Sequence, residues 1–499
     1  MKVFLMHQDR DFDMQQELPA NSAALILDLG LETIFNVMAS GDKFLYEVSQ
    51  RAVLLSLVNV HTIRYRQDIL QDCLANSSII KQIYDICVQC IHNERTRYWG
   101  GLSNYPGMIL HRSVEVLLMF VENLRKLKKI ANQESGAFNS EGFKRFFVMI
   151  IEELGEEYFT EVQDHLKRLR FRSGVLISAE LGRGNKGTNY TLLRPSESDT
   201  GWLAPILTSP IFSGKPAYTF HIADRDEAGA RALSDLRDRG INLVANALAR
   251  SNDHILSFLT ALRTELAFYI GCLNLHRQLT DRAAAICFPV PATLGARRHA
   301  FKGLYDPSVA LDRKVVGNDV IADDKDLVIV TGANQGGKTT FLRSVGLAQL
   351  MMQCGMFVPA ESFGAEVCDG IFIHFKREED NTMRSGKFDE ELSRMNDIAD
   401  RVRPNAILLF NESFAATNER EGSEIARQIV RALLEAKIKV FFVTHLFDFA
   451  HGWFEEKLSN ALFLRAERQA DGQRTFRMIE AEPLDTSYGE DLYRKIFAS

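Results

Sequence analysis

The sequence contains no apolar run of about 18 or more residues, so we expect no transmembrane helix. Its beginning, MKVFLMHQDRDFDMQQELP, turns acidic within a few residues and lacks the apolar core and the cleavage site of a signal peptide. The net charge of −6 excludes a global basic field, so any surface for nucleic acid must be local. We therefore expect a cytoplasmic protein that binds no membrane.

Cysteine is scarce, with seven scattered residues among 499. The odd count in a large chain without a signal peptide predicts reduced thiols. Cys87 and Cys90 form a single C-x-x-C with His92 just beyond it, which is compatible with a metal or redox site. No second C-x-x-C or matching His pair accompanies it, and the flanking residues are helical in pattern. We predict buried structural cysteines on one face of a helix.

The length is enough for about three domains, and we find neither an internal repeat nor a low-complexity tract. Residues 1–170 carry apolar side chains near helical spacing, with few Gly and Pro inside each segment. The predicted helix connections are polar or contain glycine, and they lie at Asn76–Ser78, Trp99–Gly107 and Asn132–Ser140.

A change of pattern follows at residues 173–205, where two short β-compatible runs flank the segment GRGNKGT. We predict a hairpin with a flexible basic tip that carries Arg183 and Lys186. A second helical block follows, from about Asp224 to Leu279. A small β insertion therefore separates two helical blocks.

Two basic clusters lie in the first helical block: Arg125, Lys126, Lys128 and Lys129, and then Lys167, Arg168, Arg170 and Arg172. Either cluster could contact a phosphate backbone. For each cluster alone, a solvated helix face is the simpler interpretation.

From about Ala285 the pattern alternates between strands and helices. Apolar strands are expected at 327–330, 371–375, 406–410 and 439–443, with two more short runs and a final helix near Glu490–Phe497. Such alternation predicts a mostly parallel sheet with helices on both faces.

The central motif is TGANQGGKTTFLR, which runs from Thr331 to Arg343 between a strand and a helix. It meets the pattern G-x-x-x-x-G-K-[ST] in full, with Gly332, Gly337, Lys338 and Thr339. Glycines allow backbone N–H groups to approach phosphate oxygens, and the helix that follows presents its positive end. Lys338 can reach the β- and γ-phosphates, and the Thr339 hydroxyl can ligate Mg²⁺. The motif predicts a nucleoside triphosphate site.

The strand AILLF ends at Asn411-Glu412, where phosphate-loop NTPases carry an acidic pair on a strand expected beside the loop strand. Neutral Asn411 should weaken Mg²⁺ binding or slow turnover, whereas Glu412 keeps the position of a general base. The next strand ends at Thr444-His445, and His445 could contact the γ-phosphate or the attacking water.

Ser385 and Gly386 open a helix after a polar loop. If they bind the γ-phosphate of a second subunit, they form a transactivating element. Otherwise they are an ordinary helix cap.

This set of motifs resembles the ATPase domain of the MutS family of DNA mismatch-repair proteins. That family's phosphate loop, Gly-x-Asn-x-Gly-Gly-Lys-Ser/Thr-Thr, is followed by a helix and a Gly-x-x-Val-Pro-Ala run, which Gly355–Ala360 matches. The similarity extends to Ser385–Phe388, Asn411-Glu412, Thr444-His445 and Thr486–Gly489, and to the segments 301–307 and 318–320 that introduce the domain. It is weaker in the helical region, including residues 44–70.

The resemblance implies a multidomain fold, with an α-helical lever/core domain at residues 1–284 and a C-terminal α/β phosphate-loop ATPase domain of the ABC type at 285–499. The hairpin would be a reduced clamp. The ATPase domains would form a homodimer, with each nucleotide held between one subunit's loop and the other's Ser385–Gly386 element, and the helical arms would open or close around DNA. ATP and Mg²⁺ would be held by Gly332, Ala333, Asn334, Gln335, Gly336, Gly337, Lys338, Thr339 and Thr340, with Asn411 at the metal and Lys338, Glu412 and His445 in hydrolysis.

The sequence departs from the family pattern in several places. We expect no room before residue 20 for mismatch-reading and connector domains, and Phe12-Asp13-Met14 does not replace the family's Phe-x-Glu wedge. Asn411 stands where Asp is usual, and we expect the dimer-stabilising extension after Thr486–Gly489 to be short or missing.

The first hypothesis is a slow MutS-like ATPase that clasps duplex or branched DNA in repair or recombination without reading mismatches. The alternative is a nucleotide-gated scaffold with little hydrolysis whose arms grip a protein or a ribonucleoprotein. The acidic net charge and Asn411 favour this alternative modestly.

Overall fold

The computed structural model describes residues 1–98, 105–171, 174–193, 221–223, 225–376, 386–469 and 472–485. Internal contacts divide the chain into two compact units. The first unit comprises Gln82–Ser135 and Phe147–Arg263, together with Met1, and the second comprises Lys2–Lys81, Gly136–Phe146 and Thr264–Ser499. The units do not follow the predicted boundary between residues 284 and 285, which stays a prediction.

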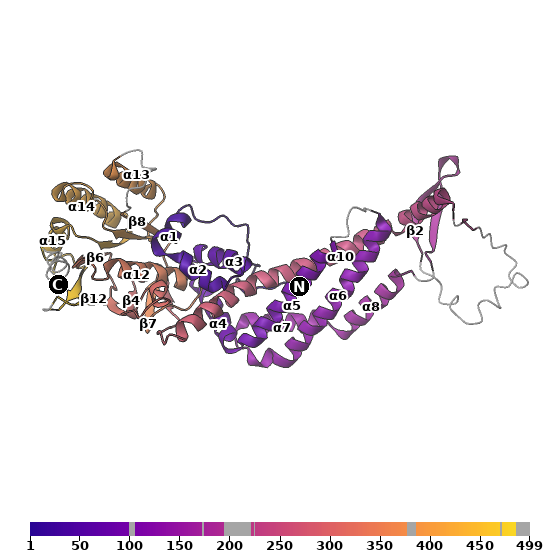
Figure 1. The fold of residues 1–499 in the computed structure, drawn as a ribbon, viewed down its shortest axis with the longest axis horizontal. Helices are drawn as coiled ribbons and strands as arrows, with labels where there is room; N and C mark the ends of the chain where they lie inside the picture. The colour runs from indigo at the N-terminus through magenta and orange to yellow at the C-terminus, as the bar shows by residue number, and fades with distance from the viewer. Residues whose placement is uncertain are drawn as a thin grey trace, which may run out of the picture. The chain divides into compact units, whose positions relative to one another are not determined.

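The first unit is helical, as predicted, and carries the predicted hairpin. Its long helices pack side by side (Figure 1), with Arg112 paired with Glu94, Lys128 with Glu156, and Asn252 donating to the carbonyl of Ser113. Its elements are α5 (Ser77–Tyr98), α6 (Pro106–Glu134), α7 (Glu141–Glu153), α8 (Glu156–Leu169), β1 (Ile177–Leu181), β2 (Gly187–Leu192) and α10 (Glu227–Thr280), some of which continue into the second unit.

Strands β1 and β2 pair antiparallel and are joined by a 3-10 turn at Arg183–Asn185, which confirms the predicted hairpin. The second helical block is a single helix of 54 residues, α10. The predicted connection at Asn132–Ser140 is shorter, because α6 continues to Glu134 and only a 3-10 turn, Ser135–Ala137, follows it. Residues 99–104 of another predicted connection lie outside the described residues.

Helix α10 contains an 18-residue window with a mean hydropathy of 1.3, long and apolar enough to cross a membrane. Within the protein, 72% of that window is buried, which is typical of the core helix of a folded domain. The bent pair α1 (Ser22–Leu29) and α2 (Leu31–Ala39) passes the same test with an 89° break. We interpret α10 as a core helix, and the absence of a membrane partner stays a prediction.

The second unit contains the predicted α/β sheet, with strands in the order β12-β11-β6-β10-β9-β8. Every neighbouring pair is parallel except β11 with β12. The strands are β6 (Leu327–Gly332), β8 (Ile371–Phe375), β9 (Ile407–Asn411), β10 (Lys439–Val443), β11 (Ala461–Arg468) and β12 (Arg474–Glu480). The central strands are nearly continuous apolar runs because both faces of the sheet are covered.

Helices cover the two faces of this sheet (Figure 1). Helix α12 (Lys338–Gln353) packs on β9 and β10, where Gly346 allows a close approach to Leu409. On the other face, Phe410, Phe442 and Phe449 belong to one buried cluster with residues of α13 (Lys387–Ala399), α14 (Glu419–Glu435) and α15 (Phe447–Glu455).

A second, four-stranded sheet was not predicted, and its strand order is β3-β7-β4-β5. Its strands are β3 (Val290–Ala292), β4 (His299–Leu304), β5 (Asn318–Ile321) and β7 (Ser362–Glu366), with the short helix α11 (Pro307–Ala310) after β4. The unit also holds α3 (Lys43–Leu54) and α4 (Val60–Ala75), whose first N–H groups are capped by the side chains of Asp42 and Asn59.

The chain's beginning is anchored inside the second unit by two buried charged side chains. Glu265 accepts hydrogen bonds from the backbone N–H groups of Leu5 and Phe12 at 2.6 and 2.7 Å, and burial raises its pKa to about 7. Arg66, which is 1% exposed, donates to the carbonyl of Met6 and to that of Cys354 just after α12. The end of α12 is therefore fixed to the helices around it.

Candidate functional site

The loop between β6 and α12 has the backbone shape that its glycines predicted. Gly332 and Gly337 have φ values of 107° and 88°, and Gln335 between them also has a positive φ of 59°. A Cβ on Gly332 would lie 2.9 Å from the backbone nitrogen of Ala466 on the neighbouring strand β11, so a side chain does not fit there. The side chains of Asn334 and Gln335 are exposed. The loop therefore offers backbone N–H groups and a helix N-terminus to an anion.

Lys338, the first residue of α12, is folded over this loop. Its Nζ donates to the carbonyls of Gly332 at 2.9 Å and Ala333 at 3.0 Å. Burial lowers the pKa of Lys338 to about 8, and the nearby charge of Glu412 opposes the shift. A buried ammonium group held by neutral carbonyls is available to a stronger acceptor such as a phosphate oxygen.

Thr339 meets Asn411 at the carboxyl end of β9, where its Oγ1 donates to Asn411 Oδ1 over 3.0 Å. The prediction that the strand of Asn411 lies beside the loop strand is wrong, because β10 pairs with both β6 and β9 and separates them. The contact still forms because Thr339 lies in the first turn of α12, and this helix packs on β9 and β10.

Glu412 and His445, two predicted site residues, also contact each other, with His445 Nε2 donating to Glu412 Oε1 over 2.8 Å. They follow β9 and β10, whose carboxyl ends meet at one edge because the strands are parallel. This hydrogen bond, more than the charges of His445 and Lys338, lowers the pKa of Glu412. Both side chains are about one-third exposed or less, so water can reach the carboxylate.

Gly386 is the N-cap of α13. Ser385 lies outside the described residues, as do Thr486–Gly489 and the predicted final helix. The role of Ser385 and Gly386 in a partner's site stays a prediction.

Phe476 on β12 is a neighbour of the loop that the sequence did not single out. Its side chain is 48% exposed, its φ is 62°, and its ring lies 3.4 Å from the position of a Cβ on Gly337. Asn318 on β5 holds this part of β12 by accepting from the backbone N–H of Met478 over 2.7 Å. Residues 318–320 carry part of the resemblance, but an isolated Phe such as Phe476 carries no pattern that indicates a site.

The side chains present fit Mg²⁺ bound together with a triphosphate. Among the described residues, no group of three or more His, Cys, Asp and Glu side chains could hold a metal alone. Mg²⁺ at phosphate sites takes few protein ligands and relies on substrate and water oxygens. The hydroxyl of Thr339 and the amide oxygen of Asn411 provide two neutral oxygen atoms at one point.

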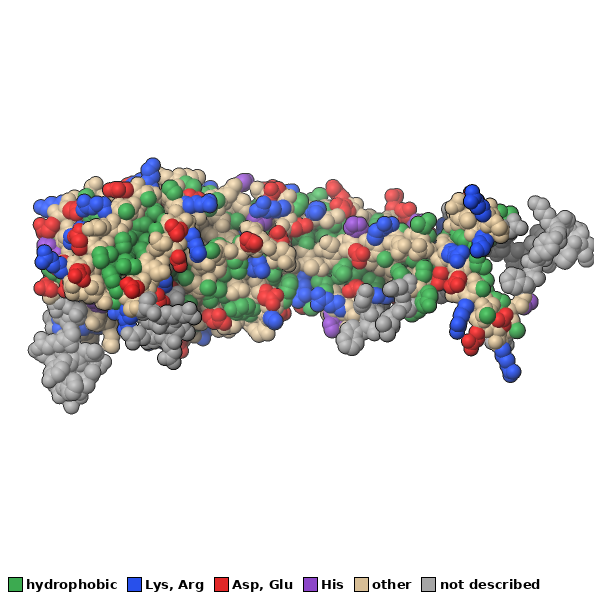
Figure 2. Space-filling model, turned by 90° about the horizontal axis from the view of Figure 1, so that it is seen from above, with side chains coloured by type: hydrophobic (Ala, Val, Ile, Leu, Met, Phe, Trp, Pro, Cys, Tyr) green, Lys and Arg blue, Asp and Glu red, His purple; other side chains and the backbone are tan. Residues whose placement is uncertain are grey.

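The basic clusters of the first unit are partly engaged by neighbouring side chains. Arg125 and Lys128 lie over the ring of Phe159, and Lys128 also forms an ion pair with Glu156 at 2.9 Å. In the second cluster, Lys167 pairs with Asp164 and Arg170 with Glu115, while Arg172 lies outside the described residues. The face drawn in Figure 2 accordingly shows basic, acidic and apolar side chains interspersed.

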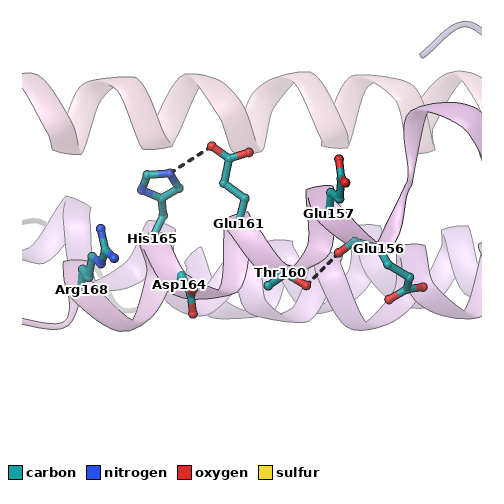
Figure 3. Close-up of a pocket in the computed structure, with 7 residues that line it drawn as sticks. All are labelled: Glu156, Glu157, Thr160, Glu161, Asp164, His165 and Arg168. Carbon is teal, nitrogen blue, oxygen red and sulfur yellow. Dashed lines mark hydrogen bonds and ion pairs between the residues drawn. The ribbon is translucent and has the colours of Figure 1, made fainter.

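A hollow of about 670 Å³ lies along the polar face of α8 (Figure 3). Its lining is mainly acidic and comprises Glu156, Glu157, Thr160, Glu161, Asp164, His165 and Arg168. Because carboxylates repel a phosphate backbone, this face of α8 does not suit nucleic acid. The neighbouring carboxylates therefore make Arg168 a poor candidate for a phosphate contact.

Cys87 and Cys90 are fully buried on α5, and burial raises the pKa of both thiols, to about 11 for Cys90. All seven cysteines are free. The predicted burial of Cys87 and Cys90 on one helix is confirmed, and the reduced state of the thiols stays a prediction.

The chain matches two family models. The MutS2 N-terminal domain matches residues 58–282, and MutS domain V matches residues 328–497. Among curated relatives, MutS protein homolog 4 of Mus musculus is 28% identical over 159 residues, which are 32% of this chain and 16% of that protein.

The DNA mismatch repair protein MutS of Streptococcus pneumoniae (strain Hungary19A-6) is 31% identical over 172 residues, or 34% of this chain and 20% of that protein. The DNA mismatch repair protein HexA of Streptococcus pneumoniae serotype 4 (strain ATCC BAA-334 / TIGR4) gives the same values. The matched stretch thus spans a fifth or less of each relative's length. With both models matching in order along the sequence, the chain belongs to the MutS family.

Proposed function

We propose that this protein is an ATPase that clasps duplex or branched DNA in repair or recombination, without direct reading of mismatches. One observation carries the catalytic part: Lys338, the Thr339–Asn411 pair and the Glu412–His445 pair meet at one edge of the sheet. The DNA part is supported by family membership and by relatives that are named DNA mismatch repair proteins.

In this proposal each side chain has one role. The loop from Gly332 to Gly337 and the N-terminus of α12 hold the phosphates, and Lys338 turns from its two carbonyl partners to a phosphate oxygen. Mg²⁺, held through Thr339 and Asn411, would neutralise charge that develops on the phosphates. The remaining roles belong to Glu412 and His445.

Glu412 takes a proton from the attacking water, and His445 orients the carboxylate through their 2.8 Å hydrogen bond. The lowered pKa of Glu412 keeps it ionised and ready to accept a proton, although it also makes it a weaker base. Because Asn411 carries no charge, we expect slow turnover. We expect the active form to be a cytoplasmic homodimer in which Ser385 and Gly386 of one subunit complete the other's site.

The test measures ATP turnover and protein mass together, with and without several DNA structures. Glu412→Gln should lower kcat by about a hundredfold or more, as loss of a general base does. The exposed Glu435→Gln on α14 is the matched control and should keep the wild-type rate. Absence of DNA binding at low salt in every nucleotide state would refute the DNA part.

A scaffold with little hydrolysis is the second candidate, and the engaged basic clusters favour it. Lys128 and Lys167 already have acidic partners, which reduces their value as phosphate contacts. This candidate predicts tight ATP binding, near-background turnover unchanged by Glu412→Gln, and a protein or ribonucleoprotein partner instead of DNA.

A further inference from the structure

The turn that carries Glu412 has an unusual backbone. Glu412 and Phe414 have φ values of 54° and 64°, in the left-handed region that residues other than glycine rarely adopt. This conformation is unfavourable for residues with a side chain, and it persists only when surrounding contacts hold it. The turn therefore needs partners, and the structure supplies them from β8 and α13.

His374 on β8 provides the first set of contacts. It is fully buried and stacks on Phe414, with ring centroids 5.3 Å apart and planes 14° apart. Its Nδ1 lies 2.7 Å from the Oγ of Ser413, and that hydroxyl lies 2.6 Å from the carbonyl oxygen of His374. The residue directly after Glu412 is thus held against β8, because the single hydroxyl proton of Ser413 has two acceptors within reach on His374, the ring Nδ1 and the carbonyl oxygen.

Helix α13 provides the second set through Glu391. Because a carbonyl only accepts, His374 Nε2 donates to the Glu391 carbonyl over 3.0 Å. The Glu391 carboxylate accepts from the backbone N–H of Phe414 over 3.1 Å. Glu391 is 4% exposed, and burial raises its pKa against the opposing effect of that N–H. Such burial of a carboxyl group is costly, so this hydrogen bond is a specific constraint on the turn.

Helix α13 links two positions near its beginning. Its N-cap is Gly386, which belongs to the predicted transactivating element, and Glu391 lies about one turn further along. A helix moves as a rigid body over such a distance, so a displacement of Gly386 moves Glu391 with it. The motion then reaches Phe414 directly and Ser413 through His374.

We propose that His374, Ser413 and Glu391 form a positioning cluster, through which α13 sets the orientation of Glu412 in the same subunit. This inference rests on the proposed function. It adds a mode of regulation: a triphosphate bound by a second copy of this chain, in contact with Gly386, aligns Glu412 for hydrolysis in the first copy. None of the cluster residues touches the reacting atoms, so each acts by positioning Glu412.

The test compares two replacements of Glu391 in the full-length protein. Glu391→Met keeps the length of the side chain and removes the acceptor, so kcat should fall about tenfold or more while KM for ATP changes less than about twofold. Glu391→Gln keeps an acceptor oxygen and should restore kcat to within about threefold of wild type. The exposed Asp389→Asn on the same turn of α13 is the control for loss of charge.

Two results would overturn the inference: an unchanged kcat in Glu391→Met, or a Gln variant no better than the Met variant. If thermal unfolding shows that Glu391→Met does not fold, Ser413→Ala decides, because it removes a single oxygen atom and should lower kcat in the same way. Glu412→Gln is measured beside them. If it keeps full turnover, the proposed function fails and the inference with it; if it abolishes turnover while the cluster variants stay active, only the inference fails.

Mixed dimers separate positioning from a general loss of structure. Each mixed dimer has one subunit with intact Glu412 and one subunit with Glu412→Gln. Glu391→Met is placed either on the subunit with intact Glu412 or on the subunit with Glu412→Gln. We expect a loss of turnover only in the first arrangement. Equal losses in both arrangements would show that α13 acts on the partner's nucleotide or on folding, and not on Glu412 of its own subunit.

Discussion

The Oγ1 of Thr339 donates a hydrogen bond to the Oδ1 of Asn411 over 3.0 Å, so the first turn of α12 touches the end of β9. Both groups are neutral, and a carboxylate at position 411 would accept the same bond with a full charge. Hydrogen bonds to charged groups are stronger by about 1 kcal/mol or more. The absence of that charge is the physical basis for expecting weak Mg²⁺ binding.

Asn411→Asp should therefore strengthen Mg²⁺ binding. We expect the Mg²⁺ concentration for half-maximal ATP turnover to fall about tenfold, because the new carboxylate attracts the cation directly or through its water. The measurement is a Mg²⁺ titration of turnover at fixed ATP. Asn396→Asp, which adds the same charge at an exposed position of α13, is the control. An unchanged Mg²⁺ dependence would show that position 411 does not contribute to the metal site.

The pKa of Lys338 predicts a pH dependence of ATP binding. Burial lowers this pKa from 10.5 to about 8, so the free protein loses the positive charge as the pH rises through about 8. Bound phosphates favour the charged form and raise the pKa, so binding above about pH 8 should take up close to one proton. Titration calorimetry in buffers with different ionisation enthalpies measures this uptake.

In Lys338→Arg the side chain stays charged over this pH range, so the uptake of a proton on ATP binding should disappear. Lys439 is the matched control, because burial also lowers its pKa to about 8. It is the first residue of β10, at the end of the strand opposite to the one that His445 follows. Lys439→Met should keep the wild-type uptake. Persistent uptake in Lys338→Arg would assign the proton to another group.

Phe476 should contribute to nucleotide affinity by contacting the nucleobase. An exposed ring beside Gly337 can stack on a nucleobase, and such stacking is worth about 1 kcal/mol or more per base. We expect Phe476→Ala to raise KM for ATP about tenfold and to leave kcat nearly unchanged. Binding of inorganic tripolyphosphate, which has no base, should not change. A parallel loss for tripolyphosphate would mean that Phe476 supports the loop and does not contact the base.

The sequence predicted the loop, Glu412 and His445 because each follows an apolar run, and parallel strands bring their carboxyl ends to one edge. The order of strands could not be predicted in the same way. Nothing local to β6, β9 or β10 states that β10 pairs with both of the others. Strand order depends on helix packing across the sheet, and the predicted neighbour of the loop strand was therefore wrong.

The positioning cluster was missed for a related reason. His374 and Ser413 are separated by 39 residues, and neither belongs to a motif, since His374 lies within the apolar strand β8 and Ser413 shortly after β9. The basic clusters show the converse, since a run of Lys and Arg is obvious in the sequence while its acidic partners lie elsewhere in the chain. Lys128 and Glu156 are 28 residues apart. Only the packing of α6 on α8 shows that this charge is already engaged.

The hairpin tip is the remaining candidate surface for nucleic-acid binding. Arg183 and Lys186 are exposed at the turn between β1 and β2. If both contact phosphates, changing both to Gln should weaken DNA binding equally for all sequences and reduce the slope of log affinity against log salt by about 1.8, since each contact contributes about 0.9. Lys128→Gln is the matched control. Lys128 already forms an ion pair with Glu156 at 2.9 Å, so this substitution should leave the slope unchanged. An unchanged slope in the tip variant would exclude the hairpin from the DNA surface, and an equal change in Lys128→Gln would move that surface to α6.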